Sequence, residues 1–169
     1  MNITRHTTTD EVLNVLTSEQ VEQVIAKIPA YPLKVPFYAM TIGDYLKCTM
    51  DGQYLWTLVA DKMAYKTFGR LRQFRSDCEN LAKYLKRYEV EQTEDERRAA
   101  FGVPFPSSTE RLLTTCVKYY HLHSTAEAEK LPLSDYIVAY KDQMSDAMYQ
   151  RNLAKIQTAK INKNAKSVR

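Results

Sequence analysis

Helix-start signals recur along this chain, and they limit its fold more than any other feature. In a capping box, Ser or Thr is followed three residues later by an acid or amide, and the two side chains satisfy backbone N–H groups at the helix start. The pattern pairs Thr8 with Glu11, Thr17 with Gln20, Thr93 with Glu96, Ser107 with Glu110 and Ser124 with Glu127, and more loosely Thr41 with Asp44. The alternation typical of strands is hard to find. We therefore predict an all-α, compact multi-helix domain of five to seven helices.

Apolar spacing gives the approximate extent of these helices. We expect one or two short helices within 9–28, a helix from 41 towards 56 that breaks near Asp51 and Gly52, a short helix beginning in 91–98, and helices at 107–121, 124–130 and 134–161. The longest helix is expected at 57–89. Its apolar residues step by three and four and predict one buried stripe: Ala64, Phe68, Leu71, Phe74, Cys78, Leu81, Leu85 and Tyr88.

Prolines suggest how the chain is divided. Pro29, Pro32 and Pro36 disfavour helix and favour an extended segment. We expect an N-terminal helix with a Pro-containing extended arm at 1–40, a helical domain at 41–161, and a flexible basic tail at 162–169. The similar segments "IGDYL" (42–46) and "LSDYI" (133–137) are interpreted as shared helix-start chemistry, with an acid in the first turn, and not as a duplication.

Length and cysteine content indicate a soluble protein. A chain of 169 residues fits one domain and can bury about 70% of its unfolded surface without a disulfide or metal. Cys48, Cys78 and Cys116 are scattered, which is typical of reduced thiols. Neither an 18-residue uncharged apolar stretch nor a signal-peptide pattern is present. We expect a cytoplasmic protein, or a virion protein if a bacteriophage encodes it, without a membrane partner.

The stretch "CVKYYHLHS" gathers Cys116, His121 and His123. Cys116 and His121 are five residues apart and point to different sides of a helix, so they are poorly placed as a nucleophile and its base. A zinc site needs at least three protein ligands, and no CxxC or HxxxH pair supplies them. The favoured interpretation is a helix end, with Cys116 in the core and the histidines near the negative end of the helix dipole.

Other catalytic patterns are also missing from the sequence. The four glycines never cluster into a phosphate-binding loop or a dinucleotide fingerprint. Glu94, Asp95 and Glu96 are followed by Arg97 and Arg98, a pattern typical of a solvated charge run. We expect no enzyme activity, no cofactor, no metal and no small-molecule substrate, although a site assembled from distant residues stays an open alternative.

Basic residues are distributed unevenly. The net charge of +4 comes from two basic regions, 61–90 and 139–169, and two acidic ones, 1–60 and 91–138. The candidate contacts to an anion or nucleic acid are Lys62, Lys66, Arg70, Arg72, Arg75, Lys155, Lys160, Lys163 and Lys166. Like charges four residues apart repel on a helix, and an anionic partner would relieve that repulsion. The alternative is a solubilising face and tail, the usual role of such charges.

Aromatic residues suggest protein contacts. Twelve tyrosines, most of them on predicted helices, suit surfaces that become buried on assembly, although packing at the core edge explains any single one as well. We expect the extended segment 29–40 to expose Tyr31, Val35, Phe37 and Tyr38 and to lie along a neighbouring subunit.

One segment resembles a known class of proteins. In "LPLSDYIVAYKDQMSDAMYQRNLAKIQTAKINK" (131–163), Leu133, Asp135, Tyr136, Tyr149 and Leu153 resemble a pattern in small bacteriophage-encoded helical proteins, some linked to tail assembly. The resemblance covers about a fifth of the chain and implies a virion component or assembly factor without catalysis.

Three hypotheses of different kinds follow from these patterns, of which an enzyme that uses Cys116 as its nucleophile is the least favoured. The first is a non-enzymatic structural or assembly protein that acts through helix-mediated contacts with a protein partner or with itself. The alternative is a nucleic-acid-binding helical module that uses basic residues of 62–75 and 151–169.

Overall fold

The computed structural model describes residues 3–10, 12–31, 36–49, 53–62, 66–104 and 107–167, without the side chains of 62 and 162–167. Within these ranges the regular structure is helical, with no strand, which confirms the all-α class. The elements in chain order are α1 (Ser18–Lys27), the 3₁₀ turn η1 (Phe37–Ala39), α2 (Ile42–Cys48), α3 (Trp56–Lys62), α4 (Phe68–Lys86), α5 (Glu94–Ala100), α6 (Ser108–Tyr119), α7 (Thr125–Ala128) and α8 (Leu133–Ser167).

Local capping signals correctly locate several helix starts. The side chains of Thr17, Thr93 and Ser107 form complete capping boxes at α1, α5 and α6. Thr41 and Ser124 accept a hydrogen bond from the third helical N–H of α2 and α7. The pair of Thr8 and Glu11 cannot be judged, because Glu11 lies outside the described residues.

The longest helix differs from the prediction. It is α8, with 35 residues, and the predicted helix at 57–89 is instead divided into α3 and α4. The break occurs because Thr67 is extended, with φ −136° and ψ 146°, and pairs with Thr8 of the N-terminal segment. The backbone of α8 continues to Ser167, so most of the expected tail at 162–169 is helical.

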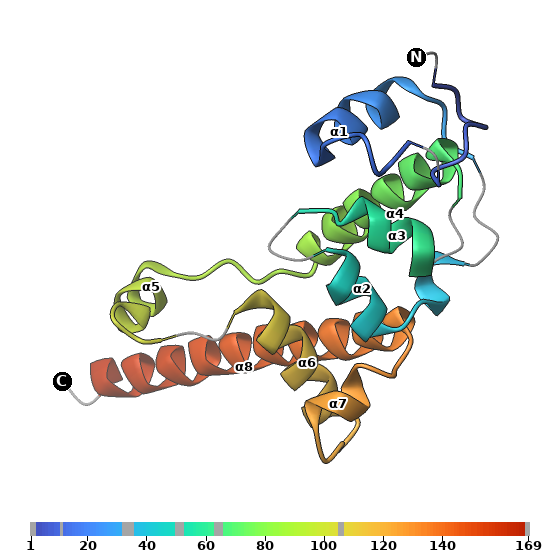
Figure 1. The fold of residues 1–169 in the computed structure, drawn as a ribbon. Helices are drawn as coiled ribbons and strands as arrows, with labels where there is room; N and C mark the ends of the chain where they lie inside the picture. Colours follow the sequence, from blue (N-terminus) through green and yellow to red (C-terminus); the bar gives the residue numbers. More distant parts are fainter. Residues whose placement is uncertain are drawn as a thin grey trace.

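The core is centred on α4. Phe68, Leu71, Phe74, Cys78 and Leu81 are buried along one face of this helix, as their spacing predicts. Val21 and Ile25 of α1 belong to the same buried cluster, together with residues of α2, α3, α6 and the first turns of α8. Figure 1 shows α1, α3 and α4 together at one end of the molecule and α8 passing beneath them.

The buried cluster also crosses the domain boundary expected at residue 40. Val12, Leu13 and Phe37 belong to it, so the described parts of 1–40 pack as part of the domain. Phe37 is only 4% exposed, and its ring meets those of Tyr45 and Phe74 edge-on. This corrects the expectation that Phe37 is exposed for a partner, because the 3₁₀ turn directs it into the core.

Two backbone bridges hold helix starts against distant parts of the chain: the starts of α2 and α8 pair with each other, and the start of α4 pairs with the N-terminal segment. At the first, the Ile42 N–H donates to the Leu131 carbonyl (2.9 Å) and the Leu133 N–H donates to the Met40 carbonyl (2.8 Å). At the second, the Thr9 N–H donates to the Lys66 carbonyl (3.0 Å) and the Phe68 N–H to the Thr7 carbonyl (3.2 Å). The first bridge sets "IGDYL" and "LSDYI" face to face at the starts of α2 and α8.

A glycine completes each bridge. It follows a threonine and a fully buried apolar residue, in Thr41-Ile42-Gly43 and in Thr67-Phe68-Gly69. The Gly43 N–H donates to the Glu129 carbonyl (2.9 Å), and the Gly69 N–H donates to the Arg5 carbonyl (3.0 Å). A Cβ on Gly69 would lie 2.9 Å from the Arg5 carbonyl oxygen, and one on Gly43 would lie 3.1 Å from Glu129 Cβ. Both glycines permit a close approach of two backbones.

None of the helices in the described ranges has a stretch apolar and long enough to cross a membrane.

We expect Gly69→Ala and Gly43→Ala to destabilise the fold, although Gly→Ala within a helix normally stabilises by about 0.5–1 kcal/mol. Forcing the two backbones apart costs about 1–3 kcal/mol, and the loss should be larger at Gly69, where the new Cβ would lie 2.9 Å from a backbone oxygen, against 3.2 Å at Gly43. The measurement is urea unfolding followed by circular dichroism. A variant more stable than the parent protein would contradict the close-approach role of that glycine.

Candidate functional site

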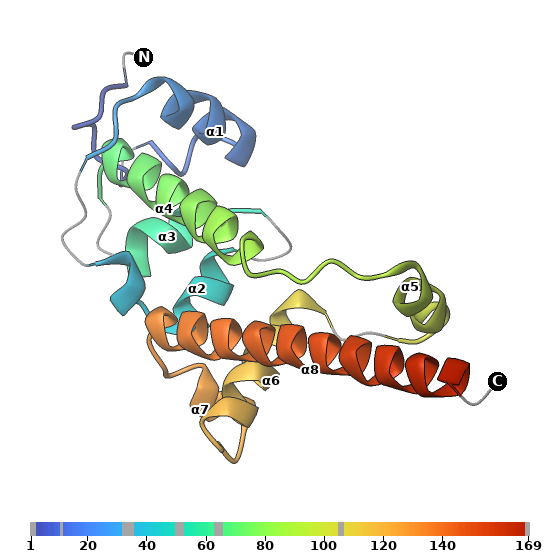
Figure 2. The same ribbon diagram turned by 180° about the vertical axis from the view of Figure 1, so that it is seen from behind.

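The second half of α8 extends beyond the rest of the molecule. At 1.5 Å per residue the helix is about 52 Å long. Its first turns are held by the core, where Leu133, Tyr136 and Ala139 are buried, whereas none of the residues 145–161 is buried. Figure 2 shows this half as a rod that continues past α6 and has only α5 beside it.

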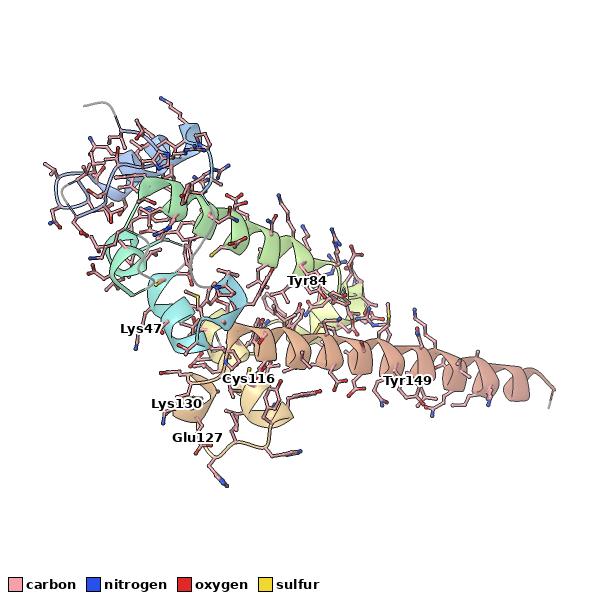
Figure 3. The ribbon with its side chains drawn as sticks, turned by 90° about the vertical axis from the view of Figure 1, so that its right-hand side faces the viewer. Lys47, Tyr84, Cys116, Glu127, Lys130 and Tyr149 are labelled. Atoms are coloured by element: carbon pink, nitrogen blue, oxygen red, sulfur yellow. The ribbon has the colours of Figure 1, made fainter. Side chains whose placement is uncertain are left out.

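Exposed apolar side chains gather at this end. We define the distal arm as α8 residues 145–161 together with α5 and Phe101–Val103. The large hydrophobic side chains that it exposes are Phe101 (91%), Val103 (50%), Met148 (57%), Tyr149 (62%), Ile156 (53%) and Ile161 (68%). Figure 3 shows Tyr149 on the extended half of α8. Apolar surface concentrated in this way is typical of a protein interaction site.

A single arginine attaches α5 to α8. The Arg151 guanidinium donates to both carboxylate oxygens of Glu96 (2.8 and 3.1 Å) and to the Glu91 carbonyl (2.6 Å). Glu96 also accepts from the Thr93 N–H in the capping box (2.7 Å). That backbone hydrogen bond, helped by Arg151, holds the pKa of Glu96 below its ordinary value. No residue of α5 is buried, so polar contacts are what hold this helix in place.

A cleft of about 1420 Å³ lies between α8, α6 and the chain that leads to α5. Tyr136, Tyr140 and Met144 of α8 contribute apolar surface to it. The charged residues around it are Lys86, Glu89, Glu91, Arg97, Arg111 and Lys118, with four positive charges and two negative ones. The cleft is therefore mildly electropositive, and it has room for a side chain or peptide of a partner.

Next to this cleft, Lys141 of α8 contacts two tyrosine rings, Tyr84 of α4 and Tyr88 just beyond the end of α4. The Lys141 ammonium lies 5.9 Å from the ring centroid of Tyr84 and 5.1 Å from that of Tyr88, and the two phenol oxygens are 3.3 Å apart. The hydrogen bonds of Tyr84 to Tyr88 and to Lys141 lower its pKa. Figure 3 shows Tyr84 between the end of α4 and α8. These contacts join the end of α4 to the first half of α8.

The predicted basic residues near α4 are largely engaged within the protein. Lys66 pairs with Asp10 at 3.6 Å, and Arg75 pairs with both Glu22 of α1 and Glu79, the latter at 2.9 Å. Arg72 is half-buried, and the side chain of Lys62 lies outside the described set. Arg75 thus joins α4 to α1 through an ion pair with Glu22. The sequence does not predict this pairing, because the two residues are far apart in the chain.

Arg70 belongs to a different cluster, around Tyr31. The Arg70 and Arg5 guanidinium carbons lie 5.6 and 5.9 Å from the Tyr31 ring centroid, and the ring of His6 meets it edge-on at 5.5 Å. The buried Nε of Arg70 finds no acceptor among the described residues. The structure thus joins one predicted anion contact to one predicted protein contact. Sequence reasoning missed Arg5 and His6, since no local pattern connects them to Tyr31.

The remaining predicted contacts lie apart from one another. Tyr38 is 44% exposed, and Val35 lies outside the described residues. Lys155 and Lys160 are exposed on the distal arm. Lys163 and Lys166 lie further along the α8 backbone, and their side chains are not among those described. The candidate anion contacts of 62–75 and of α8 therefore belong to two separate surfaces.

Cys116 is completely buried, and burial raises the pKa of its thiol to about 11. A thiolate is the reactive form of cysteine, so this environment disfavours a nucleophilic role. His121 follows the end of α6 with φ 53°, and His123 is exposed in the next turn. Within the described part of the chain, no group of three His, Cys, Asp or Glu side chains is arranged to hold a metal ion.

We expect Arg151→Met to loosen α5, because the substitution removes the guanidinium that binds both Glu96 and Glu91. Hydrogen exchange of the α5 backbone amides, measured by mass spectrometry, should become several-fold faster. Lys155→Met is the matched control, since it removes a positive charge one turn further along α8. Equal exchange rates in the two variants would show that Arg151 does not hold α5.

Comparisons of this chain with protein-family models, curated proteins and solved structures found no match, so its function has to be argued from the geometry above.

Proposed function

We propose that this protein is a non-enzymatic structural or assembly protein that associates with other copies of itself through the distal arm. The observation that carries this proposal is the placement of exposed apolar side chains. Six of the large exposed hydrophobic residues lie on the distal arm, where the described chain offers no further element to cover them.

The way the arm is held supports the same role. Its two helices are positioned by the rigid start of α8 and by the Arg151 contact, so the apolar side chains are displayed before any partner binds. A pre-formed surface binds with a smaller entropic cost than a disordered one. The likeness of 131–163 to phage tail-assembly proteins falls on this same helix and favours a role in virion assembly.

We expect the protein to form oligomers whose mass increases with concentration. A double variant, Tyr149→Ser with Ile156→Ser, should shift this equilibrium towards monomer by about tenfold or more, because two apolar side chains lose their burial at the interface. The measurement is light scattering after size exclusion, in moderate salt and after nuclease treatment. Val15→Ser is the control, because Val15 is 77% exposed but lies far from the arm in the chain. A monomer at every concentration would contradict the proposal.

Nucleic-acid binding is a second candidate function, and the cluster around Tyr31 favours it. Arg5 and Arg70 lie on one aromatic ring, and neither has a carboxylate partner among the described ion pairs. Guanidinium groups beside an aromatic ring suit a phosphate backbone with an unstacked base.

If this second function is correct, an oligonucleotide should bind with a log affinity that falls with log salt by about 0.7–0.9 per phosphate neutralised. Fluorescence anisotropy across a salt series measures the slope, and Arg5→Met and Arg70→Met should each reduce it. Arg97→Met, on exposed α5, is the control. A flat salt response would exclude this function.

A further inference from the structure

Six residues of α8 follow two parallel rows with a spacing of seven. Seven residues advance an α-helix by about 20° less than two full turns. Residues seven apart therefore lie on nearly the same side of the helix. One row contains Asp142, Tyr149 and Ile156, and the neighbouring row contains Asp146, Leu153 and Lys160. Leu153 is half-buried and the other five are exposed. We call these six residues the α8 face.

Charge on the α8 face changes sign along the helix. Asp142 and Asp146 come first, the apolar residues Tyr149, Leu153 and Ile156 occupy the middle, and Lys160 comes last. The helix dipole favours acids and bases only within the first and last turn. Asp142 and Asp146 lie beyond the first turn of α8 and Lys160 before its last, so the dipole does not explain the arrangement.

We propose that the α8 face pairs with the α8 face of a second copy in antiparallel orientation, about a two-fold axis that crosses the helix at the level of residue 151. This inference rests on the proposed function and specifies the geometry of the self-association. In this register Asp142 lies opposite Lys160 of the second copy, and Tyr149 lies opposite Leu153. The two-fold axis repeats each contact, so both ends of the interface carry an opposite-charge pair. A parallel pair would set acid against acid and lysine against lysine.

The apolar middle and the charged ends have separate effects. Tyr149, Leu153 and Ile156 from both copies form a short apolar seam of the kind that holds antiparallel helices together. The charged pairs at the ends are exposed, so they mainly set orientation and weaken with salt. The α5 helix does not block this pairing, because Arg151, which holds α5, lies on the opposite side of α8 from Tyr149.

Introduced cysteines test the orientation directly. The native Cys48, Cys78 and Cys116 are buried, so a new exposed thiol is the reactive one. Asp142→Cys and Lys160→Cys are prepared as separate proteins, mixed, and oxidised or joined by a short bismaleimide. The antiparallel pair predicts that the mixture gives the cross-linked dimer of the two variants. Asp142→Cys alone should give little, since its two thiols would lie about 27 Å apart along the axis.

Charge reversal provides the second measurement. Asp142→Lys alone should weaken association, and mixing it with Lys160→Asp should restore a dimer of the two variants, detected by light scattering. Two results would overturn the antiparallel pairing: efficient cross-linking of Asp142→Cys to itself, or oligomers that form without any cross-link in the mixture. Neither result would contradict the proposed function. A wild-type protein that stays monomeric would overturn the proposed function as well.

Discussion

The backbone bridge between Met40–Ile42 and Leu131–Leu133 is the contact on which the arrangement of this protein depends. It pairs the starts of α2 and α8 through two short hydrogen bonds, and Gly43 adds a third to the Glu129 carbonyl. Ile42 and Leu133, each fully buried, lie on its two sides. Next to the bridge, Tyr136 is buried and Tyr45 is half-buried, and burial raises the pKa of both phenols, that of Tyr45 to about 12. The bridge therefore fixes the direction of α8 at its first residue, independently of the contacts that its second half makes.

Because α8 is fixed at its start, its two halves have different roles. The first half is covered by α6, η1 and α2, and the contacts of Lys141 with Tyr84 and Tyr88 complete this attachment. The hydrogen bond from Thr115 of α6 to Gln143 (2.9 Å) follows, and beyond it the side-chain hydrogen bonds that join the described part of α8 to another element are those of Arg151. Local stability is expected to fall along such a helix as buried contacts are lost. A partner on the distal arm, as proposed above, would supply the burial that the single chain does not provide.

Much of the local structure could be predicted from the sequence, because capping boxes and apolar spacing act over a few residues. The starts of α1, α5 and α6 and the buried face of α4 are examples. Features set by distant contacts could not be predicted. The extended Thr67 depends on Thr8, the burial of Phe37 depends on Tyr45 and Phe74, and the cluster around Tyr31 depends on Arg5 and Arg70. One signal was present but unrecognised. The triplets Thr41-Ile42-Gly43 and Thr67-Phe68-Gly69 occur at the two bridges. Neither triplet identifies the distant segment with which its backbone pairs, so the sequence alone does not predict the bridges.

The basic residues show why charge alone is a poor guide to function in this chain. Lys66 and Arg75 of the first basic region are matched by Asp10, Glu22 and Glu79, so their charges help to join the N-terminal segments to α4. Arg151, in the second region, is used in the same way for α5. Lys155 and Lys160 differ, because they lie on the exposed half of α8, and the nearest acids of that helix, Asp142 and Asp146, are three or more turns away from Lys160. Charges that are separated along one straight helix cannot neutralise each other within the chain. The proposed antiparallel neighbour would bring them together between two chains.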